Sequence, residues 1–202
     1  KDKSFTDLEK EINEVNHKQF PVIDEEIGKQ MKQEIENARD RQDSVGGILE
    51  TVISGVEAGI GEPSFSSLES MLSEAMFSIP AVKGIEFGSG FDFANMYGSE
   101  ANDVWIIQDN KVITKTNHNG GINGGISNGM PITFKTVIKP TPSISLEQDS
   151  VNYETKENVK LSISGRHDPA IIHRARAVVD AMTALVIADA YMMTYGRKWF
   201  EK

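Results

Sequence analysis

The sequence of 202 residues contains no cysteine. Disulfides and metal sites built from thiolates are therefore excluded, while a reducing compartment is compatible with the composition. We predict no metal site. No run of the sequence approaches the ~20 apolar residues of a membrane span, and residues 1–10 do not resemble a signal peptide. We therefore expect a soluble, intracellular protein of the cytoplasm.

The sequence is also poor in positive charge. Lysine and arginine number 21 against 30 aspartates and glutamates, which gives a formal net charge of −9 and an isoelectric point of about 5.0. Nucleic acids and anionic membranes require a basic surface, so neither is expected as a partner, whereas a small anionic ligand in a locally basic pocket is compatible. At this length one core can bury roughly 70% of the unfolded surface. We therefore expect a single domain over residues 1–202, with residues 1–19 as a peripheral segment.

What the sequence does contain is a long apolar run near its C-terminal end. Asp168 followed by Pro169 is typical of a helix N-cap and the first helical residue. Beyond them, apolar residues recur at three- and four-residue steps, which predicts a long core helix with one buried face. These residues are Ile171, Ala175, Val178, Val179, Met182, Leu185 and Val186.

Cations crowd the predicted start of this helix. They are Arg166, His167, His173, Arg174 and Arg176. A helix N-terminus is already partly positive, so cations are unfavourable there unless an anion shares the site, and such ends bind phosphate and carboxylate groups. In the alternative interpretation the arginines only pair with Asp168, Asp180 or another acid. The sequence alone leaves both interpretations open.

Hydrophobic periodicity predicts both helices and strands in the rest of the chain. Helices are expected within residues 1–19, from a cap at Asp24 to Ala38, and from a capping box at Ser66 and Glu69 to Ile79. Strands are expected over residues 43–53, 132–138 and 159–163, and a short one after a proline turn at residue 80. Strands separated by helices of mixed lengths indicate an α+β domain with antiparallel pairing.

Two loops have the composition of anion-binding sites. Residues 116–129 include five glycines in ten residues, interleaved with asparagines, so small side chains leave the loop amides uncovered. The loop lacks the Gly-Lys-Ser/Thr ending of a P-loop, and the alternative is an irregular turn that joins two strands. Residues 139–143 are stiffened by two prolines and offer donors from a lysine, a threonine and a serine, although most Pro-x-Pro segments are connectors.

These segments together resemble the C-terminal portion of the chorismate synthases, from about Phe20 to about Tyr195. The matching stretches are Asp-Ser-Val-Gly-Gly at 43–47, Gly-Glu-Pro at 61–63, Ser-Ile-x-Ala-x-Lys-Gly at 78–84, Gly-Ser-Glu at 98–100, Asn-x-x-Gly-Gly-x-x-Gly-Gly-Ile-Ser-Asn-Gly at 117–129, Lys-Pro-Thr-Pro-Ser at 139–143, and Gly-Arg-His-Asp-Pro at 165–169 with residues 174–175 and 178–182. The resemblance implies a sandwich of antiparallel sheets around core helices, and a homotetramer.

The resemblance also implies a lyase of the shikimate pathway, in aromatic amino acid biosynthesis. Its reaction is the anti-1,4-elimination of phosphate from 5-enolpyruvylshikimate 3-phosphate to give chorismate. Reduced FMN is required but not consumed, and NADP is the associated nucleotide. Asp168 resembles the aspartate near the flavin ring that helps proton loss. The flavin-binding positions that the resemblance implies are Pro80, Ala81, Gly124, Lys139, Pro140, Thr141, Pro142, Ser143 and Arg166.

The sequence departs from the family pattern in several places. Asp180 stands where the family usually has glutamate, and Ala170 where it often has cysteine. The family's N-terminal part is missing, with its Ser-His-Gly segment, its second catalytic histidine and its Arg-Ser-Ser-Ala-Arg run. We therefore expect a C-terminal piece of the enzyme that is inactive alone. The alternatives are a non-catalytic phosphate- or flavin-binding or oligomerisation module, and a generic sugar-phosphate binder.

Overall fold

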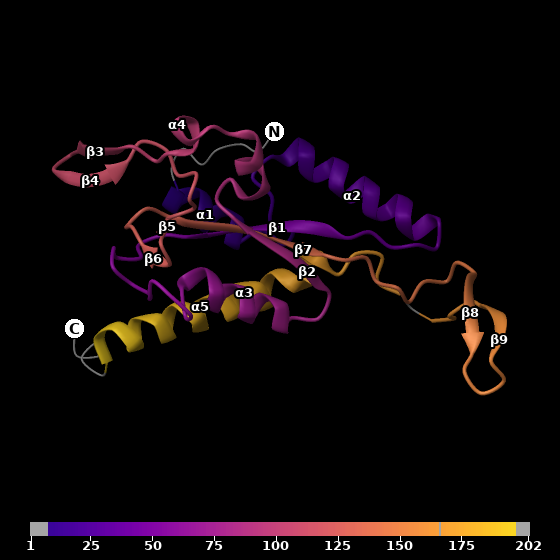
Figure 1. Ribbon diagram of the computed structural model, residues 1–202. Helices are drawn as coiled ribbons and strands as arrows, with labels where there is room; N and C mark the ends of the chain where they lie inside the picture. The colour runs from indigo at the N-terminus through magenta and orange to yellow at the C-terminus, as the bar shows by residue number, and fades with distance from the viewer. Residues whose placement is uncertain (1–7, 166, 197–202) are drawn as a thin grey trace. The chain divides into compact units, whose positions relative to one another are not determined.

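The computed structural model describes residues 8–165 and 167–196 (Figure 1). Contacts divide the chain into two compact units, and each unit combines two separate stretches. Unit 1 comprises Lys1–Gly47 and Ile138–Ala175, and unit 2 comprises Ile48–Val137 and Arg176–Lys202. Both helices and strands are present, and the three two-stranded sheets are antiparallel. The expected α+β class is confirmed, while the single domain over residues 1–202 stays a prediction.

Unit 1 begins with two helices, α1 (Leu8–Asn16) and α2 (Glu25–Asp40). Asp24 caps α2 as predicted, because its Oδ1 accepts hydrogen bonds from the N–H groups of Glu26 at 2.9 Å and Ile27 at 3.2 Å. The two helices predicted for this part of the sequence are thus confirmed over the described residues.

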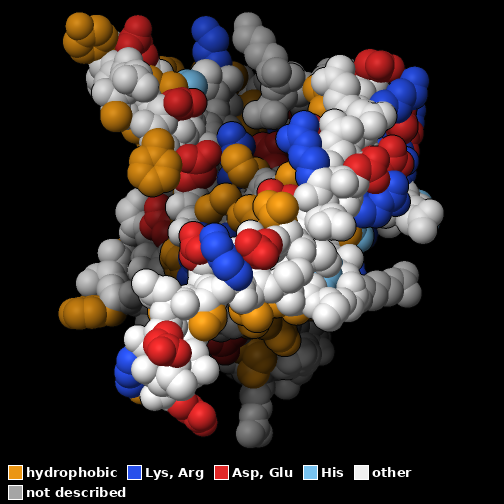
Figure 2. Space-filling model, turned by 90° about the vertical axis from the view of Figure 1, so that its right-hand side faces the viewer, with side chains coloured by type: hydrophobic (Ala, Val, Ile, Leu, Met, Phe, Trp, Pro, Cys, Tyr) orange, Lys and Arg blue, Asp and Glu red, His pale blue; other side chains and the backbone are white. Residues whose placement is uncertain are grey.

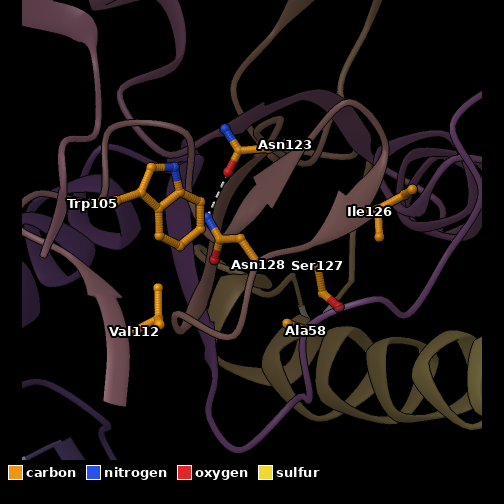
Figure 3. Close-up of a pocket in the computed structure, with 7 residues that line it drawn as sticks. All are labelled: Ala58, Trp105, Val112, Asn123, Ile126, Ser127 and Asn128. Carbon is orange, nitrogen blue, oxygen red and sulfur yellow. Dashed lines mark hydrogen bonds between the residues drawn. The ribbon is translucent and has the colours of Figure 1, made fainter. Parts of the chain in front are cut away.

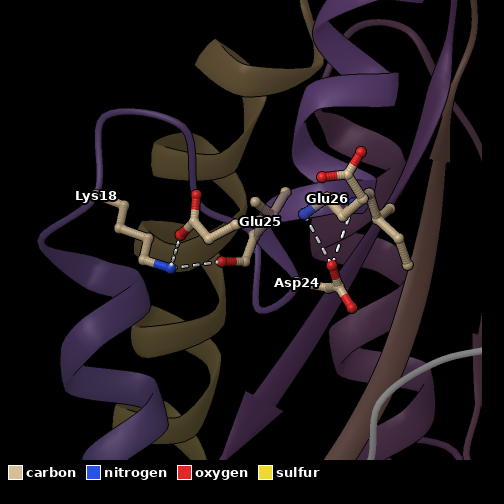
Figure 4. A network of polar contacts seen from close by, with 6 residues as sticks. Lys18, Asp24, Glu25 and Glu26 are labelled. Carbon is tan, nitrogen blue, oxygen red and sulfur yellow. Dashed lines mark hydrogen bonds and ion pairs between the residues drawn. The ribbon is translucent and has the colours of Figure 1, made fainter.

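Two lysines tie the linker between these helices to α2. The Lys18 ammonium donates to the Val22 carbonyl at 3.0 Å and pairs with Glu25 at 2.6 Å (Figure 4). The Lys32 ammonium lies 5.1 Å from the centre of the Phe20 ring, a cation–π contact. Such exposed contacts are individually weak, so they orient the linker more than they stabilise it.

Unit 1 also contains an antiparallel hairpin of β8 (Gln148–Asn152) and β9 (Glu157–Leu161). At its turn the Asn152 Oδ1 accepts hydrogen bonds from the N–H groups of Glu154 at 2.9 Å and Thr155 at 3.2 Å. The strand predicted over residues 159–163 is confirmed in its first three residues, but it begins two residues earlier and ends at Leu161.

Unit 2 is built on a three-stranded sheet of β1 (Gly47–Ile53), β7 (Ile132–Ile138) and β2 (Val82–Phe87), with β7 in the centre. Alternate residues of β7 are buried, which is the period-two pattern from which this strand was predicted with the same bounds. The strand predicted over residues 43–53 is shorter than expected, because residues 43–46 leave the sheet to contact other segments of unit 1.

The helix α3 (Leu68–Ser78) packs against β2. Leu68, Leu72 and Met76 on this helix are fully buried, as the predicted apolar stripe required. The expected capping box is wrong by one residue: the cap is Ser67, whose Oγ accepts from the Ser70 N–H at 3.1 Å. Two consecutive serines offer the same hydroxyl, and only the backbone conformation decides which one caps.

Short elements connect the strands of unit 2. Between β2 and β7 these are η1 (Gly90–Asn95), α4 (Gly98–Ala101), the hairpin of β3 (Trp105–Gln108) and β4 (Lys111–Thr114), and the hairpin of β5 (Ile122–Asn123) and β6 (Ile126–Ser127). The β3–β4 turn places Asp109 and Asn110 at positive φ, as a two-residue type I′ turn requires.

The last helix, α5 (Ile172–Tyr195), begins later than the predicted start at Pro169. The Pro169 carbonyl accepts from the Val45 N–H at 2.8 Å instead of from an amide in the next helical turn. The first helical hydrogen bonds run from the N–H groups of Arg174 and Ala175 to the Ile171 carbonyl, each at 3.0 Å. The predicted N-cap role of Asp168 is therefore wrong, because α5 begins only at Ile172 and the Pro169 carbonyl pairs with a distant segment instead of within the helix.

The helix α5 is also less buried than the predicted core helix. Val178 is 46% exposed and Leu185 is 63% exposed. The helix carries apolar residues on all of its sides, and only some of these sides are buried. Contrary to the sequence-based expectation, α5 is long and apolar enough to cross a membrane, a test that core helices of soluble proteins also pass. The Tyr191 hydroxyl accepts from the Glu57 N–H at 3.1 Å, and the Tyr195 hydroxyl donates to the Glu57 carboxylate at 2.9 Å, which ties α5 to unit 2.

Acidic and basic side chains are interspersed on the face of the molecule that Figure 2 shows. Some of them form ion pairs, such as Lys135 with Glu86 at 3.7 Å in unit 2. Pairs on the surface contribute little to stability because water and salt screen them. The fold therefore depends on its buried apolar residues.

Thr136 is the site of a stability prediction. It is fully buried in the centre of β7, and its hydroxyl has no hydrogen-bond partner among the described residues. An unsatisfied buried hydroxyl costs about 1–3 kcal/mol, and valine has the same shape without it. We expect Thr136→Val to raise the free energy of unfolding by about 1 kcal/mol in urea titrations. Thr133→Val, on the half-exposed side of the same strand, is the control. A lower urea midpoint for Thr136→Val would contradict the prediction.

Candidate functional site

Three segments of unit 1 that are distant in the sequence meet through hydrogen bonds. The Ser44 hydroxyl donates to the Thr141 carbonyl at 2.7 Å. The next residue, Val45, donates its N–H to the Pro169 carbonyl at 2.8 Å. Residues 44–45 therefore join the predicted flavin-binding segment, residues 139–143, to the segment that carries Asp168. We call this pair of hydrogen bonds the Ser44–Val45 bridge.

Two glycines allow the backbones to approach closely at this bridge. A Cβ atom on Gly46 would lie 2.4 Å from the Ile138 carbonyl oxygen and 3.0 Å from the Pro140 ring. A Cβ atom on Gly47 would lie 2.4 Å from the Ile172 side chain, at the start of α5. At Gly46 the neighbours are a backbone carbonyl and a proline ring, so only a residue without a Cβ fits there, whereas at Gly47 the flexible Ile172 side chain could move aside. The close approach at Gly46 is therefore set by covalent geometry before any ligand binds.

Residues 139–143 differ in exposure. Lys139, Pro140, Pro142 and Ser143 are exposed, whereas Thr141 is partly buried. The hydroxyl oxygen of Thr141 is itself buried and has no hydrogen-bond partner within the part of the chain that the structure describes. Buried hydroxyls are nearly always paired, so this one needs a hydrogen-bond acceptor that the described residues do not supply.

The Asp168 carboxylate is held on both sides. Its Oδ1 accepts from the Ala170 N–H at 3.1 Å, and its Oδ2 forms an ion pair with the Arg174 guanidinium. The Asp168 side chain is 27% exposed, so solvent or a ligand can still reach it. A carboxylate fixed in this way is oriented without being buried.

The two described arginines at the start of α5 follow the interpretation in which they pair with acids. Arg174 pairs with Asp168, and Arg176 lies 3.7 Å from Asp180. Burial raises the pKa of the Asp180 carboxyl above its ordinary value, although nearby Arg176 acts in the opposite direction. Arg166, predicted to bind the flavin, lies outside the described residues.

The predicted flavin contacts Pro80 and Ala81 form the turn between α3 and β2 in unit 2. The Val82 N–H donates to the Ile79 carbonyl at 3.3 Å, which closes a four-residue turn. Ala81 has φ +73°, a conformation that type II turns usually assign to glycine. The alanine is therefore strained, and strained backbone is common where a ligand binds.

The glycine loop, residues 116–129, does not leave all of its amides free for an external anion. The Asp103 carboxylate accepts hydrogen bonds from the N–H groups of His118 at 2.8 Å and Asn119 at 2.9 Å. The second half of the loop is the β5–β6 hairpin. The structure thus combines the two predicted interpretations: the loop is an ordered turn, and part of its anion-binding surface is filled by a carboxylate of the protein itself.

Gly124 lies at the tip of the β5–β6 hairpin. It has φ +59°, it is exposed, and a Cβ atom there would meet no atom within 4 Å. A hollow of about 420 Å³ lies beside the same hairpin (Figure 3), with Trp105 and Val112 on one side and the hydrogen-bonded pair of Asn123 and Asn128 on the other. The open tip leaves the Gly124 backbone accessible to a flat ligand.

The structure groups the predicted site residues by unit. Residues 139–143 and Asp168 are brought together in unit 1, whereas Pro80, Ala81 and Gly124 lie on loops of unit 2. Sequence reasoning missed Ser44, Asp103 and Trp105. The Asp-Ser-Val-Gly-Gly stretch could have indicated Ser44, but no local signal indicates a lone aspartate or tryptophan next to a short hairpin.

Comparison with known proteins identifies relatives along almost the whole chain. The family model described as chorismate synthase matches residues 4–192. A chorismate synthase of Methanosarcina mazei is 47% identical over 183 residues, which are 90% of this chain and 50% of that protein. The chorismate synthase of Methanococcus maripaludis is 49% identical over 160 residues, 79% of this chain and 43% of that protein.

A solved structure gives the same result. The "Crystal Structure of Chorismate Synthase" superimposes with a TM-score of 0.76 at 28% identity, covering 97% of this chain and 53% of that chain. The chain therefore spans about half the length of the relatives that it matches.

Proposed function

The chain belongs to the chorismate synthase family, and we propose on this basis that it supplies the C-terminal part of an enzyme that forms chorismate. The reaction is the anti-1,4-elimination of phosphate from 5-enolpyruvylshikimate 3-phosphate, a carbon–oxygen lyase step in aromatic amino acid biosynthesis. Because the chain spans about half of its relatives, we expect these 202 residues alone to be inactive.

The observation that carries this proposal is the Ser44–Val45 bridge. It holds residues 139–143 beside the segment of Asp168, so that a phosphate-binding turn and a proton-handling carboxylate share one region of unit 1. The close approach at Gly46 fixes the same arrangement through the backbone. Groups that are positioned before binding lose less entropy when a ligand arrives, which favours a binding site.

The residues of this region fit a flavin phosphate. Lys139 brings an exposed ammonium, Thr141 a buried hydroxyl without a partner, and Ser143 an exposed hydroxyl. Phosphate oxygens accept hydrogen bonds from all three groups, and the two prolines limit the motion of the donors. When bound, reduced FMN supplies electron density to the substrate as phosphate leaves.

Asp168 is proposed to help remove the proton from the substrate ring. Its hydrogen bond from Ala170 and its ion pair with Arg174 orient the carboxylate before the substrate binds. A base must lie within hydrogen-bond reach of the proton that it accepts, so this orientation matters more than basicity alone. Arg166 is proposed to hold the cofactor or the substrate anion.

Pro80, Ala81 and Gly124 are proposed as further flavin contacts, through their backbones. Two observations support the assignment: the positive φ of Ala81 and the uncovered backbone of Gly124. Both positions expose main-chain groups that a flat ring can approach without meeting a large side chain.

Family membership also leads us to propose a cytoplasmic homotetramer that uses NADP as its associated nucleotide, with the 202 residues forming one domain. Large apolar side chains on the surface support assembly with other chains, since exposed apolar patches commonly mark protein interfaces. Phe65 is 97% exposed, Ile107 is 77% exposed and Val112 is 67% exposed.

A second candidate is a non-catalytic flavin- or phosphate-binding or oligomerisation module. Within it, the oligomerisation role is favoured by the pairing of Arg174 and Arg176 with carboxylates, which leaves fewer cations for an external anion. Under a purely oligomeric role, residues 139–143 would have no ligand to hold. Titration with the cofactor separates these functions.

Lys139→Ala is expected to weaken FMN binding. A hydrogen bond to a charged group contributes about 1.5–3 kcal/mol, so the Kd measured by flavin fluorescence should rise about tenfold or more. Lys160→Ala is the matched control, because Lys160 is also exposed in unit 1 but pairs with Asp149 on the β8–β9 hairpin. Equal FMN affinities for the wild-type chain and Lys139→Ala would contradict the proposed cofactor site.

A complementation assay tests the catalytic part of the proposal. The chain is mixed with the remaining portion of a chorismate synthase, reduced FMN and 5-enolpyruvylshikimate 3-phosphate, and chorismate is measured. Formation of chorismate is expected from the mixture and from neither part alone. A mixture that folds and binds FMN but stays inactive would favour the non-catalytic module.

A further inference from the structure

Asp103 is the most deeply buried acid in the part of the chain that the structure describes. It directly precedes the β3–β4 hairpin and is 5% exposed. No other acidic or basic side chain of the described residues is buried to this degree. Burying a carboxylate is costly unless it is fully hydrogen-bonded, so its surroundings need an explanation.

Four donors surround the Asp103 carboxylate, and all four come from residues 116–119 of the glycine loop. The Oδ1 atom accepts from the Thr116 hydroxyl at 2.7 Å and the His118 N–H at 2.8 Å. The Oδ2 atom accepts from the Asn119 N–H and the Asn119 side-chain amide, each at 2.9 Å. This arrangement of donors is one that binds free anions in other loops.

The pKa of Asp103 agrees with a carboxylate that is surrounded by hydrogen-bond donors. Burial acts to raise the pKa of the Asp103 carboxyl, but the hydrogen bonds from Asn119, Thr116 and His118 outweigh it and hold the pKa below its ordinary value. The carboxylate is therefore ionised at neutral pH, and the loop encloses an anion that belongs to the protein.

Asn117 lies between the residues that Asp103 holds, and its side chain connects this segment to the β5–β6 hairpin. The Asn117 side chain accepts from the Gly121 N–H and donates to the Pro131 carbonyl, both at 2.8 Å. The Gly121 carbonyl in turn accepts from the Asn128 N–H at 3.0 Å, just beyond β6. The segment held by Asp103 thus helps to fix both ends of the hairpin whose tip is Gly124, next to which the Leu68 N–H donates to the Gly125 carbonyl at 3.0 Å.

A second contact joins the same loop to the end of β2. The Ser89 N–H donates to the His118 carbonyl at 2.7 Å, and the Ser89 hydroxyl lies 2.9 Å from the His118 Nδ1. These contacts hold only His118, whereas the Asp103 carboxylate holds three of the four residues from 116 to 119. Asp103 is therefore the main anchor of residues 116–119, whereas the β5–β6 half of the loop is also held by hydrogen bonds to residues 57–61 and to Leu68.

We propose that Asp103 is a positioning residue that acts as a built-in anion: its carboxylate occupies the donor pocket of residues 116–119 and so, together with the contacts of residues 57–61 and Leu68, sets the position of the Gly124 tip. The consequence for the cofactor rests on the proposed function, in which Gly124 contacts the flavin. The anchoring itself is independent of that function. If Asp103 anchors the loop in this way, an external carboxylate should be able to replace its side chain in an Asp103→Ala variant.

The test is chemical rescue of Asp103→Ala by formate. Removing the carboxylate leaves four donors in a cavity, so the Tm should fall by about 5 °C or more. Formate at 0.1–0.5 M, roughly the range in which a weak ligand is effective, should restore several degrees by binding the folded state. Sodium chloride at equal ionic strength should not restore the Tm.

Asp92→Ala is the control, because Asp92 is an exposed acid on η1. This variant should show neither the loss of Tm nor the rescue by formate.

A second variant and amide hydrogen exchange also test whether Asp103 anchors the loop. If Asp103→Ala does not fold, Asp103→Asn keeps the volume but turns an N–H donor toward the Asn119 donors, and it should be less stable than the wild type and unresponsive to formate. Amide hydrogen exchange at Gly120 and Gly121 should become at least about tenfold faster in the variant and slower again with formate. Unchanged exchange in the loop, or equal effects of formate and chloride, would overturn the proposal.

FMN titrations of the same proteins separate this proposal from the proposed function. If both hold, FMN binds Asp103→Ala about tenfold more weakly, and formate restores part of the affinity. If formate rescues loop protection but the wild-type chain does not bind FMN, the anchor is supported and the flavin site is contradicted. If the wild-type chain binds FMN but formate has no specific effect, the proposed function stands and the built-in anion does not.

Discussion

A Gly46→Ala variant is expected to lose FMN binding and about 3 kcal/mol of unfolding free energy. The new Cβ atom would lie 2.4 Å from the Ile138 carbonyl oxygen, 3.0 Å from the Pro140 Cδ and 3.1 Å from the Pro140 nitrogen. These neighbours are a carbonyl and a proline ring, which cannot rotate away as a flexible side chain would. Inserting a methyl group into a packed site typically costs 1–3 kcal/mol, occasionally more.

The functional effect of Gly46→Ala follows from what must move. To admit the Cβ atom, residues 43–47 have to separate from residues 138–140, and the Ser44–Val45 bridge would lengthen with them. Residues 139–143 would then lose their fixed position beside Asp168. FMN titration and urea denaturation measure the two effects separately.

Gly98→Ala is the control for Gly46→Ala. A Cβ atom on Gly98 meets no atom within 4 Å, and this glycine opens the short helix α4. Its replacement should leave FMN binding unchanged and stability equal or slightly higher. If Gly46→Ala bound FMN as well as Gly98→Ala, the close approach at residue 46 would not matter for the site.

A Phe134→Ala variant is expected to lose about 3–5 kcal/mol of unfolding free energy. Phe134 is 1% exposed in β7, the central strand, and its ring centre lies 5.7 Å from that of Phe87 on β2. The substitution removes a large apolar surface from the core, opens a cavity and deletes an aromatic pair. Because β7 leads directly into residues 139–143, the predicted binding segment should become more mobile as well.

Urea denaturation followed by circular dichroism measures this loss. Phe91→Ala is the matched control, since Phe91 is 82% exposed on η1 and its removal should change the free energy of unfolding by less than about 0.5 kcal/mol. Similar urea midpoints for the two variants would mean that β7 is not the centre of the core.

The helices and strands were predictable where one residue pattern dominates. The alternation in β7 gave its bounds, and Asp24 followed by an apolar stripe gave α2. The predictions were wrong at the ends of helices. The start of α5 was misplaced because the Pro169 carbonyl is taken by Val45, and the cap of α3 was assigned to Ser66 although Ser67 makes the hydrogen bond.

The candidate site was predictable in its segments but not in its contacts. The family motifs named residues 139–143, Asp168 and Gly124, yet they did not indicate that Ser44 would join two of these segments. The glycine content of residues 116–129 also suggested that the loop would present free amides, whereas Asp103 fills part of it. A side chain that bonds across the fold leaves no periodic signal in the sequence.

The order of residues was sufficient to identify the family, the α+β class and the residue types that suit a phosphate-bearing ligand, because these depend on local order and motif. Which groups are already paired could be read only from the folded chain: Asp168 with Arg174, Asp103 with the glycine loop, and Ser44 with residue 141. The physical reason is that a hydrogen bond depends on a separation of about 3 Å in space, and folding brings together atoms whose positions in the chain say nothing about that distance.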